Sequence, residues 1–509
     1  MSENQTNQIS LVRGLGLIAA ISIIIGNVIG TGVFLKARVM TCNLGSPEWV
    51  VIAWIAAGIL SLAGALTYAE LTAMKPESGG EYVFLRDGYG KVWGFLFGWM
   101  RTFIAQTGSQ AAVAVAFAIG LNDFYGGAIK KTLLQTEIWG SPFEITSLQL
   151  IAVFMIGLFT IINCASVVLA GRIATVLTFV KIGLILFVGL GAFIWVTGGD
   201  FGNFSLISDG GKCEGVADSV KYGSPNYSFM AGFAAAMLGA LWGYDGWNNL
   251  SHVAGEVKQP ERNIPLALIG GTLLIIFLYV FVHIAYFYVL DPTSIASVSK
   301  DSSVAKEVVS KFFGGDVTSF ATGLAISIFT IGLMLSSIGT LHTSILTGAR
   351  APYAMAQDGI MFESIGKLSQ KTKVPVVSII VQGIWACILA LSGSFDTLTD
   401  YVIFGSWIFY ALATSTVFVF RIKYPNVKRP YKAFGYPIVP VLFLFVAGWL
   451  LLTTIWTDFG KGMGLIGEQQ YWDGFKEILF SPSLKGIFLI LLGLPIYYYL
   501  VGRNKETNE

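Results

Sequence analysis

Two hydrophobic segments of this chain are interrupted by glycines in the same way. Residues 23–35 read IIIGNVIGTGVFL, and residues 234–250 read AAAMLGALWGYDGWNNL. A membrane-spanning helix keeps its backbone hydrogen bonds internal, because lipid offers no replacement partner. Breaks are tolerated where the freed groups face protein or a polar cavity, and a matched pair of breaks indicates the substrate site of a secondary transporter. Glycines at these spacings can instead simply allow helices to pack closely. The presence of two such clusters favours the interpretation as a substrate site.

The composition predicts a membrane protein and argues against several other classes. Of the 509 residues, 54% are hydrophobic and 12% are charged, against about 25% charged residues in soluble domains. The net charge of +2 gives no reason to expect a nucleic acid as a partner. The four cysteines form no CxxC pair and the chain has no histidine cluster, so we expect neither a metal nor a cofactor. No nucleophile–histidine–acid constellation indicates an enzyme, and no catalytic residue is assigned.

Twelve segments are apolar over the roughly 20 residues that a helix needs to span a bilayer. They cover about 15–36, 49–73, 92–121, 148–169, 173–197, 229–250, 266–290, 318–347, 375–393, 397–420, 437–457 and 484–502. An even number of spans places both termini on one side of the membrane. The short loops 367–373 and 421–432 are rich in lysine and arginine, which predicts that this side is the cytoplasm. The polar N-terminus has no small-residue cleavage site, so the first span is expected to be retained.

The interrupted segments are the first and the sixth of these spans. This spacing predicts two five-helix halves followed by two further helices. The expected divisions are a cytoplasmic tail (1–14), a first five-helix repeat (15–197), an extracellular loop (198–228), a second five-helix repeat (229–420), helices eleven and twelve (421–502) and a second cytoplasmic tail (503–509). The longest irregular connections are expected at roughly 122–147, 198–228, 291–317 and 458–483, all on the outer side.

The two breaks have the chemistry to hold an amino acid. At a break, one half-helix exposes its last C=O groups and the other its first N–H groups, and the helix dipoles add partial charge. In the first break, Gly30, Thr31 and Gly32 can present N–H groups to a carboxylate, since glycine has no Cβ in the way. Three backbone carbonyls of the second break can accept hydrogen bonds from an ammonium, those of Leu241, Trp242 and Gly243.

Eight motifs, in order between about residues 10 and 445, resemble those of a known family. They are GNVIGTGVF (26–34), GALTYAEL (64–71), SGGEYVFL (78–85), INCASV (162–167), FVKIG (179–183), LWGYDGWNNL (241–250), ERNIPLALI (261–269) and SILTGAR (344–350). The chain resembles a bacterial member of the amino acid–polyamine–organocation superfamily and is most similar to the L-type amino-acid transporter family.

The resemblance implies an all-α membrane fold of twelve helices with a LeuT-like five-plus-five inverted repeat, in a bacterial inner membrane. It also implies sodium-independent amino-acid transport, commonly by exchange. The family's substrate contacts map onto six residues, Val28, Thr31 and Gly32 in the first span and Trp242, Gly243 and Asp245 in the sixth. The family usually has an aromatic residue at Trp242 that covers the substrate from outside, and Trp is larger than the Phe common in animal members.

Lys181 lies within an apolar stretch, about 12 Å past the preceding loop at 1.5 Å per residue. A charge at this depth is costly and indicates a function by default, although a lysine near a helix end can snorkel to water. The family carries a lysine here, where related sodium-coupled transporters bind their ion. The resemblance implies that the ammonium replaces Na⁺ and joins the first break to the eighth span, with candidate partners Ser336, Ser337 and Thr340. A buried lysine can also lose its proton, so proton coupling stays open.

Other polar residues within the spans have more than one interpretation. Arg101 could pair with Glu70 or Asp245, or bind backbone carbonyls at a break, and we favour a structural salt bridge. Asp245 could bind the substrate ammonium or hold the unwound segment through hydrogen bonds, and we favour the second. His283 and His342 fit core histidines with satisfied hydrogen bonds, although His342 borders the proposed site and an imidazole can titrate near neutral pH.

The positions of the four cysteines indicate which disulfides, within the chain or to a partner chain, are expected. Cys42 and Cys213 both fall on the predicted outer side and could form a disulfide, whose geometry the sequence cannot fix. Cys164 and Cys387 fit buried thiols. Animal members carry a cysteine that joins them to a glycoprotein heavy chain, and the matching loop here, 121–146, has none. No disulfide-linked heavy chain is expected.

These observations predict a carrier of neutral L-amino acids that works by alternating access without sodium, through exchange or uniport. Its partners are the amino acid and the lipid bilayer. The alternative is a proton-coupled amino-acid symporter with Lys181 as the proton site. A sensor that binds amino acids without transporting them is a further hypothesis, because a carrier and a sensor share the binding step. Side-chain preference depends on the pocket volume around Val28, Trp242 and His342.

Overall fold

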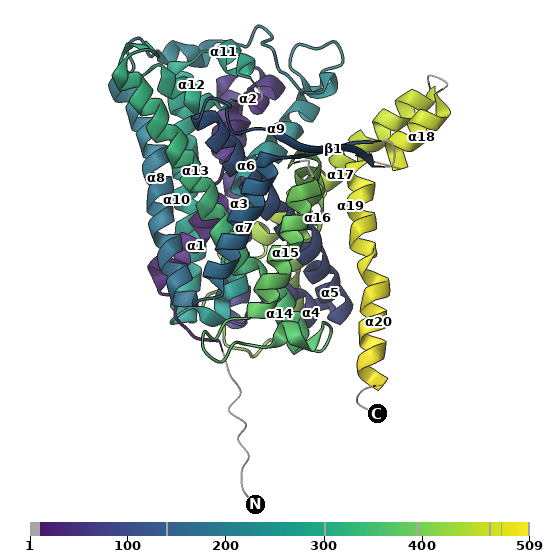
Figure 1. Ribbon diagram of the computed structural model, residues 1–509. Helices are drawn as coiled ribbons and strands as arrows, with labels where there is room; N and C mark the ends of the chain where they lie inside the picture. The colour runs from purple at the N-terminus through teal and green to yellow at the C-terminus, as the bar shows by residue number, and fades with distance from the viewer. Residues whose placement is uncertain are drawn as a thin grey trace, which may run out of the picture.

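The computed structural model describes residues 11–138, 141–299, 302–392, 395–467, 470–479 and 481–506, and it is almost entirely helical (Figure 1). In the described residues, eight helices are long and apolar enough to cross a membrane, or nine if the bent pair α1 (Leu17–Val28) and α2 (Gly32–Leu44) is one span. The two members of that pair are bent by 41°. The chain is therefore a multi-pass membrane protein.

The first half of the chain contains the following further elements: α3 (Pro47–Met74), α4 (Glu81–Tyr89), α5 (Lys91–Met100), the π-helix η1 (Arg101–Ala105), α6 (Gln106–Phe124), β1 (Thr132–Ile138), β2 (Ser141–Thr146), α7 (Ser147–Asn163), α8 (Val167–Trp195) and the 3₁₀ turns η2 (Phe201–Ser205) and η3 (Asp218–Val220). The helices α5, η1 and α6 are continuous and form one span. The strands β1 and β2 pair antiparallel as an isolated hairpin.

The second half continues with α9 (Phe229–Tyr244), the 3₁₀ helix η4 (Asn249–Glu256), α10 (Pro260–Val289), α11 (Pro292–Ser297), α12 (Val304–Ser310), η5 (Phe312–Gly314), α13 (Phe320–Gly348), α14 (Arg350–Gln357), η6 (Glu363–Gly366), α15 (Val376–Ser392), α16 (Phe395–Lys423), α17 (Ile438–Gly467), α18 (Tyr471–Leu479), α19 (Pro482–Leu491) and α20 (Gly493–Glu506).

Local sequence explains where several of these helices begin. Proline occupies the first turn of α3 and α10, where its missing N–H has no intrahelical partner in any case. A capping box of Thr146 and Gln149 opens α7. The side chain of Ser166 caps α8 by accepting a hydrogen bond from the N–H of Val168.

The described chain begins and ends at the same face of the helix bundle, here called the terminal face (Figure 1). The helices α4 and α14 lie toward this face. The hairpin β1–β2 and the helices α11, α12 and α18 lie toward the opposite face (Figure 1). Inside the bundle, α1 packs against α8, α10 and α13, and α2 packs against α9. Both interrupted segments are thus surrounded by other helices.

The structure corrects several predicted boundaries. The first span was expected to end near residue 36, but α2 continues to Leu44. Three of the expected irregular connections contain regular elements: the β1–β2 hairpin, the helices α11 and α12, and an extension of α17 to Gly467 followed by α18. The helix α20 reaches Glu506, inside the expected C-terminal tail. Residues 1–10 and 507–509 of the two expected tails, and the end of the expected span 375–393, lie outside the described residues.

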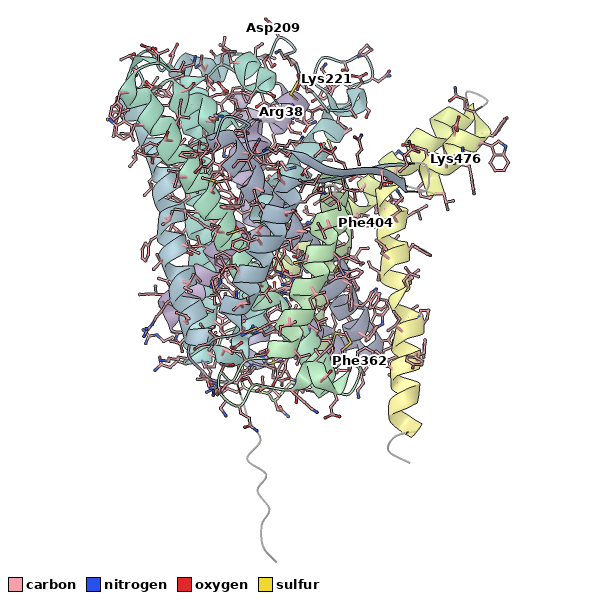
Figure 2. The ribbon with its side chains drawn as sticks, viewed as in Figure 1. Arg38, Asp209, Lys221, Phe362, Phe404 and Lys476 are labelled. Carbon is pink, nitrogen blue, oxygen red and sulfur yellow. A yellow bond between two sulfur atoms is a disulfide. The ribbon has the colours of Figure 1, made fainter. Side chains whose placement is uncertain are left out.

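Cys42 and Cys213 form a disulfide at the opposite face, a pairing that the sequence left open (Figure 2). It joins the C-terminal part of α2 to the long connection between α8 and α9. Cys164 and Cys387 are free thiols of intermediate exposure.

Candidate functional site: two adjacent helix breaks

The first break leaves three successive backbone N–H groups available. The helix α1 ends at Val28 and α2 begins at Gly32. In the described part of the chain, the N–H groups of Gly30, Thr31 and Gly32 have no hydrogen-bond acceptor. Such N–H groups at the start of a helix, where the dipole is positive, attract an anion. The break therefore offers a carboxylate a binding site made of backbone.

The second break adjoins the first. The helix α9 ends at Tyr244, and Gly246 follows with a φ of 103°, which favours glycine. A Cβ on Gly246 would lie 2.9 Å from Cβ of Asn27, next to the end of α1. A Cβ on Gly32 would lie 2.9 Å from Cζ3 of Trp242 and 3.1 Å from Cα of Gly243. The two breaks thus touch through positions that have no room for side chains.

The carbonyls near the end of α9 are only partly occupied. The N–H of Asp245 donates to the carbonyl of Trp242 at 3.2 Å, so the carbonyl of Leu241 loses its usual partner four residues on. The carbonyl of Gly243 accepts from the hydroxyl of Tyr279 at 3.0 Å. The same hydroxyl also lies 3.1 Å from the carbonyl of Val28, so its single proton is shared between the two carbonyls. Tyr279 on α10 therefore holds the two breaks side by side.

Asp245 and Trp242 flank this junction. Oδ1 of Asp245 accepts from the hydroxyl of Tyr410 on α16 at 2.7 Å, which anchors the unwound segment. The ring of Trp242 covers Gly32 and has Nζ of Lys36 4.8 Å from its centroid. Trp242 and Lys36 therefore close the approach to the breaks from the side of α2.

Lys181 on α8 is completely buried and joins three elements. Its ammonium donates to the carbonyls of Gly26 at 2.7 Å and of Ile29, and to Oγ1 of Thr340 on α13 at 2.7 Å. Three donors thus meet three acceptors. Ser336 shares this cluster, since its hydroxyl reaches the carbonyl of Ile29 at 3.4 Å. Ser337 is turned away and bonds to the carbonyl of Leu333 in its own helix.

The favoured salt bridge for Arg101 is wrong. Within the described chain no carboxylate oxygen lies within 4.0 Å of its guanidinium. Nη2 of Arg101 instead donates to Oδ1 of Asn249 at 2.5 Å, and its Nε is buried without a partner. Glu70 is held by Arg421 and Arg429 on the terminal face. Arg101 lies at the start of the π-helix η1, which changes the facing of its side chain relative to a regular helix.

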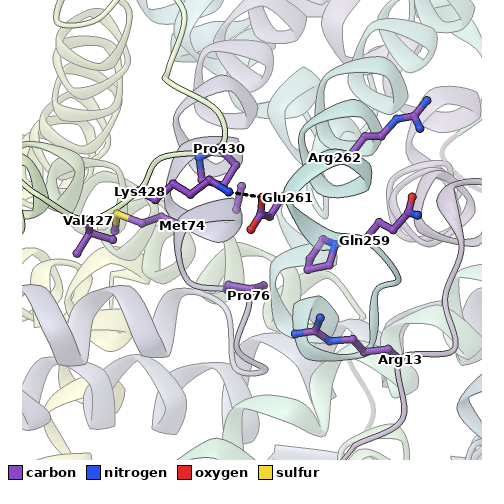
Figure 3. Close-up of a pocket in the computed structure, with 11 residues that line it drawn as sticks. Arg13, Met74, Pro76, Gln259, Glu261, Arg262, Val427, Lys428 and Pro430 are labelled. Carbon is purple, nitrogen blue, oxygen red and sulfur yellow. Dashed lines mark hydrogen bonds and ion pairs between the residues drawn. The ribbon is translucent and has the colours of Figure 1, made fainter.

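The interior cavity at the breaks is small and polar. It has a volume of about 30 Å³ and is lined mainly by Asn27, Arg101, Gln106, Ser109, Asp245, Asn249, Thr340, Ser344, Ser406 and Tyr410. This volume admits one or two water molecules but not an amino acid. The conformation is therefore closed around the breaks. A larger hollow of about 750 Å³ lies elsewhere, on the terminal face between Arg13, Arg262, Lys428 and Glu261 (Figure 3).

Two of the histidines, His283 and His342, are buried in the core as expected. Nε2 of His342 lies 2.8 Å from the carbonyl of Ala170, and its Nδ1 lies 3.0 Å from Nδ2 of Asn163. Nδ1 of His283 lies 2.7 Å from the carbonyl of Tyr279, but its Nε2 is buried without a partner, so the hydrogen bonds of His283 are satisfied only in part. The third, His252 on η4, was missed in the sequence. It lies against Glu81 of α4 with both side chains fully buried, and its position two residues after the motif LWGYDGWNNL was the available signal.

A bundle of apolar helices with two adjoining backbone breaks, one rich in free N–H groups, defines a membrane carrier of the broken-helix class. Residues 15–462 match the family model described as amino acid permease, and the chain belongs to this family. The resemblance read from the motifs is thus confirmed.

Similar proteins cover nearly the whole chain. The serine/threonine exchanger SteT of Bacillus subtilis is 29% identical over 504 residues, 98% of this chain and 99% of that protein. The b(0,+)-type amino acid transporter 1 of Mus musculus is 28% identical over 448 residues, with 88% and 83% coverage. The large neutral amino acids transporter small subunit 2 of the same organism is 27% identical over 519 residues, with 98% and 89% coverage.

Proposed function

We propose that this permease carries neutral L-amino acids across the membrane by exchange, through alternating access and without sodium. The observation that carries the proposal is the row of free N–H groups at Gly30, Thr31 and Gly32, beside the end of α9. The substrate carboxylate accepts from these N–H groups, with the hydroxyl of Thr31 as a further donor. The substrate ammonium donates to the carbonyls of Leu241, Trp242 and Gly243. Val28 and Asp245 complete the wall of the site.

The architecture proposed for this carrier has twelve spans and an inverted five-plus-five repeat. Nine spans follow from the long helices and the bent pair, and α7, α15 and the α9–η4 pair bring the number in the described chain to twelve. The two broken spans are then the first and the sixth. The terminal face, which carries Arg86, Arg172 and Arg421, is the cytoplasmic side. A bacterial inner membrane is the proposed location.

The side-chain end of the substrate faces the polar cavity. Its lining is made of hydroxyl, amide and charged groups, including Gln106, Ser109 and Ser344. Nε2 of Gln106 already donates to Oγ of Ser344 at 2.5 Å, but a large apolar side chain would keep water from the remaining donors and acceptors of this lining, which is costly. Small polar amino acids therefore suit this site better than large apolar ones, and Trp242 leaves little space on the side of α2.

Lys181 supports sodium independence and argues against a proton role for itself. Its ammonium already occupies the space between the first break and α13, so a second cation there would be repelled at short range. An uncharged lysine amine has two protons and would keep all three contacts only if the hydroxyl of Thr340 turned to donate to it. Lys181 is thus a structural cation under this proposal. The proton-coupled alternative then needs a different proton site.

No heavy-chain partner is proposed. The two outer cysteines, Cys42 and Cys213, are bonded to each other. The remaining cysteines, Cys164 and Cys387, lie at the end of α7 and within α15. Neither has the exposed loop position from which an intermolecular disulfide would form.

The test is counterflow in proteoliposomes loaded with unlabelled amino acid. We expect labelled serine to enter loaded vesicles at least tenfold faster than empty ones, and competition across all amino acids to rank small polar side chains first. Binding without counterflow would identify a sensor and overturn the proposal. Accumulation driven by an imposed pH gradient in vesicles without internal substrate would favour the symporter.

A further inference from the structure

Arg101 carries a buried positive charge that its neighbours satisfy only in part. Its Nη2 donates to Oδ1 of Asn249 at 2.5 Å, whereas its Nε is buried without an acceptor. The guanidinium forms no ion pair within the described residues. A guanidinium has five N–H donors and stays charged at every pH that a protein meets. Because unused donors on a buried charge are costly, Arg101 is suited to bind one more acceptor.

The π-helix η1 explains how this side chain comes to line the interior cavity. The N–H of Gln106 donates to the carbonyl of Arg101, five residues earlier, in place of the carbonyl four residues earlier that a regular helix uses. With this wider turn, Arg101, Ala105, Gln106 and Ser109 all line the same cavity. Single π turns of this kind are frequent at functional sites. The local backbone therefore favours a functional role for the residue that the turn reorients.

The cavity that Arg101 lines adjoins both helix breaks. Asn27 near the end of α1, and Asp245 and Gly246 in the second break, line the same space. In the proposed clamp, backbone groups of the two breaks hold the carboxylate and the ammonium of the substrate, so its Cα lies between the breaks. The cavity is then the polar space beside that carbon. Its volume of about 30 Å³ suits the end of a small side chain.

The charges near Arg101 favour a side chain that has no charge of its own. The carboxyl groups of Glu81 and Asp245 interact electrostatically with Arg101 but form no ion pair with it. One ionised carboxylate is enough to balance one guanidinium, so an acidic side chain would add an excess negative charge to a buried cluster, which is strongly disfavoured. A basic side chain would be repelled by Arg101. An uncharged oxygen accepts a hydrogen bond and leaves the balance of charge unchanged.

We propose that Arg101 determines substrate specificity by donating a hydrogen bond to an uncharged oxygen at the end of the substrate side chain. The carrier then selects amino acids with a hydroxyl or a carboxamide group, such as serine, threonine and asparagine. The inference rests on the proposed carrier function and adds to it a residue and a chemical class of substrate. The competing interpretation is that Arg101 only holds Asn249 in the segment that follows the second break.

The experiment is counterflow of labelled serine into proteoliposomes that contain the full-length chain, with unlabelled competitors of matched size. Threonine and valine differ by a hydroxyl in place of a methyl group. Threonine should reach half-inhibition at a concentration at least about tenfold lower than valine, because a hydrogen bond to a charged donor is lost with valine. Asparagine should be favoured over aspartate to a similar extent. Equal inhibition by threonine and valine would overturn the proposal, and so would aspartate that inhibits as well as asparagine.

A variant separates the specificity role from a structural one. Arg101→Met removes the donors and keeps an unbranched side chain, so the preference for threonine over valine should fall below about twofold. A merely structural arginine would instead weaken both amino acids alike and leave their ratio as in the wild type. Arg38→Met is the matched control, because Arg38 is also buried but lies on α2 and donates to the carbonyl of Glu214 at 2.9 Å. It should keep the wild-type ratio.

The outcomes also separate this inference from the function on which it rests. No counterflow with any amino acid would overturn the carrier proposal itself. Thermal stabilisation of the detergent-purified protein by threonine and by valine would then still decide the role of Arg101, and it serves equally for a variant that binds without transporting. Counterflow with equal inhibition by threonine and valine would reject the specificity role alone. A preference for threonine that persists in Arg101→Met, or that is lost in Arg38→Met, would reject it as well.

Discussion

At the scale of single residues, the site depends on glycine. Gly32, Gly243 and Gly246 lie where the two breaks meet and have no side chains, so backbone groups can approach a substrate and each other. The residues that carry side chains here hold the backbone in place. Tyr279 joins both breaks through one hydroxyl, and Lys181 collects the acceptors that the first break frees. Substitution of a glycine at a break and substitution of a residue that holds the backbone should therefore affect the carrier in different ways.

Gly32→Val should abolish substrate binding while the protein still folds and reaches the membrane. The new Cβ would stand 2.9 Å from the ring of Trp242 and 3.1 Å from Cα of Gly243. It would therefore push the two breaks apart, beside the N–H groups offered to the carboxylate. We expect affinity in a binding assay to fall at least tenfold. Gly183→Ala is the control, since a Cβ at Gly183 meets nothing within 4 Å. Normal affinity of Gly32→Val would show that the carboxylate binds elsewhere.

Lys181→Ala should slow exchange more than it weakens binding. Removing the ammonium leaves the carbonyls of Gly26 and Ile29 without their charged donor. Each lost buried hydrogen bond costs about 1–3 kcal/mol, enough to change the balance of conformations that differ by a few kcal/mol. Turnover by counterflow and affinity by binding measure the two effects separately. Lys371→Ala, at an exposed position, is the control. A large loss of affinity with unchanged turnover would instead place Lys181 in direct contact with the substrate.

At the scale of elements, the sequence could predict the breaks but not most contacts across them. The glycine clusters mark where α1 and α9 end, because a break leaves a local signature in residue type. The contacts of Arg101 with Asn249 and of Glu81 with His252 join residues that are 148 and 171 positions apart, and no sequence periodicity indicates them. The π-helix η1 shifts Arg101 away from the partners that regular helix geometry suggests. The helices α11, α12 and α18 were missed because they are short or amphipathic.

The disulfide is the element-scale feature best suited to a direct test. It closes a sequence separation of 171 residues between α2 and the connection before α9. Cross-links of this span restrict the unfolded chain strongly, by several kcal/mol in the chain-entropy model. The double variant Cys42→Ser with Cys213→Ser should therefore unfold several degrees lower in a thermal melt of detergent-purified protein. Reductant should lower the wild type toward the same midpoint. Two additional reactive thiols in the unreduced wild type would contradict the bond.

At the scale of the whole molecule, the two faces are held closed by different means. Trp242 and Lys36 cover the breaks from the side of α2. On the terminal face, Arg86 of α4 pairs with Asp358 just after α14 at 2.6 Å, and the buried pair of Glu256 and Arg350 joins η4 to α14. Ionic contacts thus concentrate at the terminal face, whereas packing of an aromatic ring dominates on the side of α2.

Transport should not depend on sodium, and this prediction concerns the carrier as a whole. A carrier coupled to Na⁺ needs a site whose occupancy changes between its two open conformations. The space between the first break and α13 is filled by the ammonium of Lys181, which has its full set of three acceptors. We expect initial counterflow to change by less than about twofold when choline replaces all external Na⁺. The same measurement on Lys181→Ala is a more direct test, because the carbonyls that lose the ammonium could attract a cation. A sodium response that appears only in this variant would show that the ammonium takes the place of the ion. A wild-type rate that falls severalfold in choline would show that sodium binds elsewhere in the carrier and would reject the proposal.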